Sequence, residues 1–197
     1  MRYLALDFET GNASPLSACA LGASVFEDNQ LVDEKISLIR PPECVGKFHW
    51  GNVRVNHIKE KMVADAPSFA EVWEPLADIA EGCVIVCHNA MFDTNVLCSC
   101  LAHYGLKMPE CRYLCTVKVS KRVWPELENH KLDTVSAALH IDLNHHEAGS
   151  DARTPTHWQK KSACGSAGFP RWGKRRAASP GTPNPGSTGG QRVRVIR

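Results

Sequence analysis

Two carboxylates near the amino terminus, Asp7 and Glu9, have a spacing that suits metal-ion chemistry. They follow the apolar run Tyr3–Leu6, which is typical of a buried strand. Side chains two residues apart on a strand point to the same face, so the two carboxylates can share one cation or bridge two. Divalent cations relieve the repulsion between carboxylates at the rim of a core, and they prefer oxygen ligands. The pair alone is also compatible with a solvated strand end.

A third carboxylate, Asp93, lies between an apolar run and a helical pattern. Val84–Cys87 predicts a fully buried strand, and the pattern after His88 predicts a helix with Asp93 in its first turn. An acid at that position is stabilised by the helix dipole without any catalytic role, and Asn89 would be a helix cap. Taken singly, these residues indicate only a well-formed helix start.

A last group, His145, His146 and Asp151, follows the final helical pattern. A histidine titrates near neutrality and is therefore suited to general-base catalysis beside a carboxylate. A capping acid with surface histidines is the alternative interpretation.

The elements that would position these residues follow from hydrophobic periodicity. The first strand starts at Tyr3 and contains both early acids. Further strands are predicted at 18–26, 31–39, 84–87 and 112–115, and helices at 56–63, 68–80, 90–104, 116–124 and 131–140. Three antiparallel strands followed by alternating helix and strand predict an α/β fold with a mixed sheet flanked by helices.

In chain order, the three groups resemble the motifs of a known family. The segments Asp7–Thr10, His88–Asp93 and His146–Asp151 look like the three motifs of the DEDDh 3′–5′ exonuclease superfamily. That superfamily includes the epsilon proofreading subunit of bacterial replicative polymerase, ribonuclease T and oligoribonuclease. Segments 56–69 and 130–139 add to the similarity. The resemblance covers residues 1–153 and implies a ribonuclease H-like fold for an exonuclease domain.

The resemblance implies a two-metal hydrolytic mechanism. Asp7, Glu9, Asp93 and Asp151 would bind two divalent cations, Mg²⁺ or Mn²⁺, one activating the attacking water and the other stabilising the leaving 3′-oxygen. His146, rather than its neighbour, would be the general base.

The resemblance also implies substrate contacts. The backbone around Phe8, Glu9 and Thr10 would contact the terminal nucleotide, and Asn89 would orient the helix that carries the third acid. The rings of Phe8 and Phe92 are expected to pack in the core rather than to stack on bases.

The implied function is hydrolysis of single-stranded DNA or RNA 3′ ends to 5′-mononucleotides, of a DNA proofreading or repair type, with a DNA polymerase as a further partner. DNA and RNA are not distinguished, because no residue can be placed against the 2′-hydroxyl.

The pattern breaks after Asp151. The family continues with a long helix that carries this acid, whereas Pro155 follows in this chain and no apolar stripe comes after it. The alternative function is therefore a catalytically impaired module that binds nucleic acid or a partner. Residues 1–153 have a net charge of −7, and residues 154–197 contain nine basic and no acidic residues. This Gly- and Pro-rich tail is expected to be disordered. An out-of-frame reading, a basic arm for nucleic acid and a tether to a partner are three explanations for it.

The cysteines and the apolar runs bear on disulfides, zinc sites and membrane association. Nine cysteines without a CxxC pair indicate reduced, mostly buried thiols rather than disulfides or zinc. No stretch reaches the roughly 18 apolar residues of a membrane span, and the amino terminus lacks a secretory signal, so we expect a cytoplasmic protein with no membrane partner.

Overall fold

A computed structural model describes residues 1–141 and contains the mixed sheet expected from the sequence. Residues 142–197 lie outside the described part. The predictions for His146, Asp151, the boundary after residue 153 and the tail fall on those residues and stay predictions. No helix of the described residues is long and apolar enough to span a membrane.

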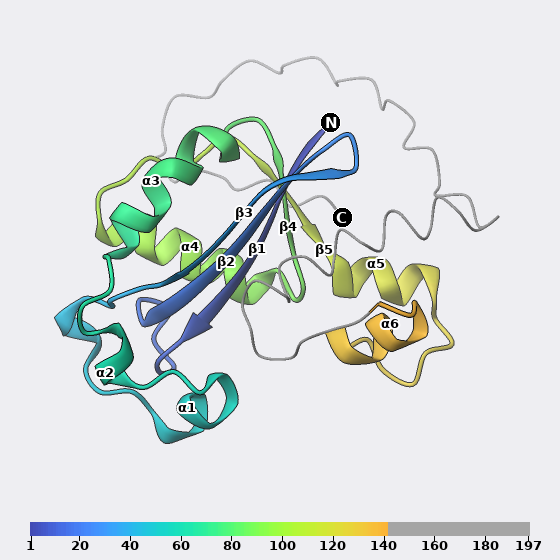
Figure 1. The fold of residues 1–197 in the computed structure, drawn as a ribbon. Helices are drawn as coiled ribbons and strands as arrows, with labels where there is room; N and C mark the ends of the chain where they lie inside the picture. Colours follow the sequence, from blue (N-terminus) through green and yellow to red (C-terminus); the bar gives the residue numbers. More distant parts are fainter. Residues whose placement is uncertain (142–197) are drawn as a thin grey trace, which may run out of the picture.

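The five strands form one sheet in the order β3-β2-β1-β4-β5 (Figure 1). The first three form an antiparallel meander, and β1, β4 and β5 run parallel. The strands are β1 (Arg2–Thr10), β2 (Ala18–Glu27), β3 (Gln30–Leu38), β4 (Val84–Cys87) and β5 (Arg112–Cys115). Because parallel strands end at the same edge, the residues after β1 and β4 are brought close together.

Six α-helices lie between and beyond these strands in the described part. Figure 1 shows α3 and α4 grouped beside the sheet and α5 and α6 grouped near the end of β5. The helices are α1 (Trp50–Asn56), α2 (Glu60–Val63), α3 (Phe69–Ala80), α4 (Met91–His103), α5 (Thr116–Val123) and α6 (Leu132–Ala138), and a short 3₁₀ helix covers Glu43–Val45.

Alternation along β1 separates a core face from a face with the acids. Leu4, Leu6 and Phe8 are buried in the main core. The same core contains Phe69, Trp73 and Leu76 of α3 and Val96, Leu97 and Leu101 of α4. The intervening residues of β1 point to the other face, where a small apolar cluster contains Ala5, Val84 and Val86. Asp7 and Glu9 continue this second series, so neither displaces an apolar side chain from the main core.

Helix α3 begins where its sequence predicts. The Ser68 hydroxyl accepts a hydrogen bond from the Glu71 N–H, and the Glu71 carboxylate accepts one from the Ser68 N–H. These reciprocal bonds form the capping box expected from the two residues.

The predicted helix over 56–63 is present only in its second half, as α2, and the preceding helix α1 was not predicted. The chain between the two helices passes through His57 with a φ of 59°. A left-handed residue cannot continue an α-helix, so α1 ends at Asn56 and a separate helix begins at Glu60.

Candidate active site

The carboxylates of Asp7 and Glu9 lie on the same face near the end of β1, and both residues are partly buried. In the register with β2, Asp7 is paired with Gly22 and Glu9 with Ala20. Cross-strand neighbours on one face lie about 4.5–5.5 Å apart, so larger side chains at these positions would crowd the carboxylates. The small residues of β2 therefore leave space beside both acids, a role that the sequence reasoning missed although the run of small residues at 18–24 signals it.

Strand β1 extends beyond its parallel neighbour. Its pairing with β4 covers only Tyr3–Ala5, so within residues 1–141 the segment that contains Asp7 and Glu9 has no strand partner on that side. The Phe8 N–H instead donates a hydrogen bond to Oδ1 of Asp93, at 3.0 Å. This bond joins residues 85 positions apart and places the third predicted acid between the first two in β1.

Asp93 is 2% exposed and is the third residue of α4. The pKa of this carboxyl is raised to about 7: burial is the largest cause and the negative charge of Glu9 adds to it, while hydrogen bonds from the backbone at Phe8 and Asp93 oppose the shift. The charge of Glu9 thus opposes ionisation of Asp93, and a bound cation would relieve the repulsion between the two carboxylates.

The Cys87 thiol at the end of β4 is affected by the same carboxylates. Burial raises its pKa well above the usual value, and Asp93 and then Asp7 add to the shift. Both carboxylates thus act on one buried group, which supports their proximity.

All the predicted metal ligands present offer oxygen atoms, the donors that Mg²⁺ and Mn²⁺ prefer. The Oδ2 atom of Asp7 is buried and Asp93 is almost fully enclosed, as expected for carboxylates that face a cation rather than water. Within residues 1–141, however, no group of three or more His, Cys, Asp or Glu side chains is arranged to hold a metal ion. The donor chemistry therefore fits a hard cation. The described residues do not complete the predicted set of metal ligands, because Asp151 lies outside them.

His88 occupies the first position after β4. Its Nδ1 lies 2.9 Å from the Thr116 hydroxyl, which also donates to the Cys87 carbonyl. Burial lowers the pKa of His88 to about 4, although hydrogen bonding to the His130 backbone and the charge of Asp133 oppose the shift. His88 is therefore neutral near pH 7 and links β4 to the start of α5.

The other predicted contact residues have different environments. Phe8 is buried, and its ring lies 6.3 Å from that of Phe69, as expected for core packing. Phe92 is 43% exposed, so the expectation that its ring packs in the core is wrong. Asn89 is exposed with a φ of 63°, and Ala90 rather than Asn89 is the N-cap of α4. Met91 at the first position of α4 faces outward, and the neighbouring Phe92 ring is also exposed to solvent.

Thr10 is buried and serves as an anchor for α1. The Asn52 and Asn56 side-chain amides both donate to its carbonyl oxygen at 3.1 Å, and Asn52 also contacts its hydroxyl at 3.2 Å. These two asparagines were not predicted as contact residues from the sequence. They are four positions apart, a spacing that places two side chains on the same face of a helix.

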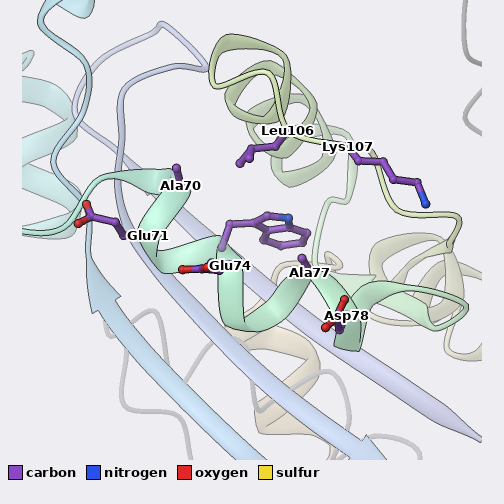
Figure 2. A pocket seen from close by; sticks show the side chains of 8 residues that line it. Ala70, Glu71, Glu74, Ala77, Asp78, Leu106 and Lys107 are labelled. Atoms are coloured by element: carbon purple, nitrogen blue, oxygen red, sulfur yellow. The ribbon is translucent and has the colours of Figure 1, made fainter.

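A separate surface hollow of about 500 Å³ lies along α3 (Figure 2). Figure 2 shows the side chain of Leu106 facing α3 across this hollow. Its lining residues are Ala70, Glu71, Trp73, Glu74, Ala77, Asp78, Leu106 and Lys107. None of the predicted site residues lines it, so the hollow is distinct from the site on β1 and α4.

The fold is shared with solved nucleases. Exonuclease X, solved in complex with 5′ overhanging duplex DNA, matches with a TM-score of 0.61 and 20% identity over 83% of this chain and 91% of its own. Exonuclease I of E. coli, solved with a 5cy-dA13 oligonucleotide, matches with a TM-score of 0.70 and 14% identity over 83% of this chain and 40% of its own. A sheet of this topology with acids at the carboxyl end of β1 defines a ribonuclease H-like exonuclease fold.

The exonuclease family RNase_T matches residues 4–156, and the chain belongs to this family. DNA polymerase III PolC-type from Caldanaerobacter subterraneus subsp. tengcongensis is 30% identical over 77% of this chain and 11% of its own length. The 3′–5′ exonuclease DinG of Bacillus subtilis is 29% identical over 77% of this chain and 16% of its own. The chain therefore spans only about a tenth to a sixth of these relatives. The family resemblance and the fold predicted from the sequence are confirmed.

Proposed function

We propose that the chain is a metal-dependent 3′–5′ exonuclease that releases 5′-mononucleotides from single-stranded nucleic-acid ends. The observation that carries the proposal is the convergence of Asp7, Glu9 and the buried Asp93, joined through the Phe8 N–H. Carboxylates gathered at one end of a strand repel one another, and bound divalent cations relieve this repulsion.

The proposed ligands of two divalent cations, Mg²⁺ or Mn²⁺, are Asp7, Glu9, Asp93 and Asp151. The bound ions would supply Lewis-acid stabilisation of the developing charge and lower the pKa of a coordinated water. His146 would take the proton from the attacking water, because a neutral imidazole accepts a proton near pH 7.

The residues in the described part have supporting roles in this proposal. The Phe8 N–H orients the Asp93 carboxylate, and the anchored Thr10 holds the end of β1 in place. The backbone of Phe8 and Thr10 would contact the terminal nucleotide, and Asn89 would orient the start of α4. Their placement around the acids supports these roles.

Single-stranded DNA is the proposed substrate. The relatives include a DNA polymerase III, and the structure of Exonuclease I contains a deoxyadenosine oligonucleotide. A DNA polymerase is the proposed partner on the same ground, with a proofreading or repair role in the cytoplasm.

Stepwise shortening of a 5′-labelled single-stranded oligonucleotide from its 3′ end, with Mg²⁺ or Mn²⁺, tests the activity. Asp7→Ala and Asp93→Ala should each reduce the rate at least about 100-fold, because each removes a ligand that acts in the transition state. Asp33→Ala, which removes an exposed acid on β3, is the matched control and should retain the wild-type rate. Full activity in Asp7→Ala protein would refute the proposed mechanism.

A catalytically impaired binding module is the second candidate. It is favoured by one observation in the sequence: Pro155 follows Asp151 and no apolar stripe comes after it, so the helix expected to carry this acid is interrupted. Binding of single strands that persists with a metal chelator, without mononucleotide release under any divalent ion, would support this candidate instead.

A further inference from the structure

Trp50, the first residue of α1, is 70% exposed, whereas Trp73 in the core is 2% exposed. An indole ring left in water at this level forgoes roughly 2–3 kcal/mol of burial. Its ring lies 5.5 Å from that of the exposed His49, so the two rings form a small aromatic surface. Exposed aromatic rings are the platforms on which the bases of single-stranded nucleic acids stack.

Several contacts fix α1 beside the end of β1. In addition to the asparagine bonds to Thr10, the His49 N–H donates to the Gly11 carbonyl at 2.8 Å. The Phe48 ring packs against Gly11 so closely that a Cβ there would lie 2.5 Å from it. The helix that carries Trp50 is thus fixed to the two residues that directly follow Glu9 in the sequence.

The charge around α1 is opposite to that of the domain. Residues 47–61 contain four basic residues and one acidic residue, while residues 1–153 have a net charge of −7. The acidic residue, Glu60, accepts a hydrogen bond from the Phe48 N–H. Arg54 lies four residues after Trp50 and therefore on the same side of the helix. This side of α1 combines an aromatic ring with a cation that matches a phosphate.

We infer that this side of α1, made by Trp50 and Arg54, binds the single-stranded substrate next to the carboxylates. Trp50 stacks on a base, and Arg54 contacts a backbone phosphate. The inference rests on the proposed function and adds a substrate-binding surface to it. Stacking on an aromatic ring tolerates every base, which suits an exonuclease that proceeds through any sequence.

Binding of a fluorescein-labelled single-stranded 12-mer to the full chain with EDTA, followed by anisotropy, tests this surface. Trp50→Ala should weaken binding about 5- to 150-fold, the loss expected for one base–aromatic stack, and Trp50→Phe should retain most of the affinity. Arg54→Ala should reduce the slope of log K against log salt concentration by about 0.7. Val55→Ala is the matched control, since Val55 is 57% exposed on another side of α1.

If Trp50 had a structural role, Trp50→Ala would lower the thermal midpoint of unfolding. The proposed binding role predicts an unchanged midpoint, because the side chain is exposed.

The outcomes separate the two proposals. Wild-type affinity in Trp50→Ala protein, or no binding of the 12-mer by the wild type, overturns the inference. Binding that depends on Trp50 without mononucleotide release in Mg²⁺ or Mn²⁺ supports the surface and overturns the proposed exonuclease activity.

Discussion

Asp93 is the residue at which folding and the proposed chemistry conflict. Its carboxylate is almost fully buried and lies near Glu9, and burial is the largest cause of its raised pKa. A buried charge of this kind destabilises the folded state unless a cation compensates it. The cost is consistent with selection for a ligand position rather than for stability.

The free energy of unfolding without metal should depend on pH through Asp93. Its pKa is near 3.8 when unfolded and about 7 when folded, so the folded state binds more protons between these values and loses stability as pH rises from about 4 to 7. Asp93→Asn removes this loss. In urea unfolding with EDTA, the variant should be more stable than wild type at pH 8 by on the order of 3 kcal/mol and similar near pH 5. Equal differences at the two pH values would contradict the assignment.

His88 should produce the opposite trend. Its pKa falls from 6.5 to about 4 on folding because of burial, so the unfolded state binds more protons between these values. Stability from this group therefore rises as pH increases from about 4 to 6.5. In the wild type the two trends partly cancel. In Asp93→Asn, the increase in the free energy of unfolding between pH 4 and 6.5 should become visible. The measurement is the same urea titration, and the control is the double variant Asp93→Asn/His88→Gln, in which the rise should be absent.

At the level of elements, the site depends on strands of unequal length. Strand β1 continues past the pairing with β4, and the gap is filled by the start of α4 on one side and the anchors of α1 at its end. The polar backbone left unpaired by this mismatch is satisfied by side chains of Asp93 and Asn56. The end of β1 is thus held on two sides by elements distant in sequence.

Asn56→Ala should test the α1 anchor. The Asn56 side chain donates to the Thr10 carbonyl and accepts from the Ile58 N–H, and the residue is 6% exposed. Loss of two buried hydrogen bonds should reduce the free energy of unfolding by about 2–3 kcal/mol. Asn52→Ala, at a more accessible position, should cost about 1 kcal/mol. Urea unfolding at pH 7 measures both, and a smaller loss for Asn56→Ala than for Asn52→Ala would contradict the anchor.

For the whole molecule, binding of divalent cations should raise the thermal midpoint. A ligand at 100 times its Kd stabilises the folded state by about 2.7 kcal/mol, or about 5–10 °C for a chain of this size. Differential scanning fluorimetry with Mg²⁺ or Mn²⁺ against EDTA measures the shift. The variant Asp7→Asn/Glu9→Gln should lose it, and Asp33→Ala should keep it. A shift of equal size in the Asp7→Asn/Glu9→Gln variant would place the cations elsewhere.

The strands and most helices could be predicted because their signals are local. Period-two and period-3.6 apolar patterns, the Ser68 and Glu71 cap and the meander turn all lie within a few residues of the elements they define. The exception is α1, which contains Gly51 and has no apolar stripe. Its stability comes from bonds to Thr10 and Gly11 rather than from helix propensity.

By itself the sequence determined the family, the succession of strands along the chain and the three groups of candidate residues, because these depend on residue types and spacings along the chain. The tertiary structure decided which distant groups meet. The Phe8 and Asp93 contact, the small residues opposite the acids and the exposure of Trp50 beside the end of β1 were not visible in the local pattern. They depend on strand register and on packing between segments tens of residues apart, which periodicity within one segment does not encode.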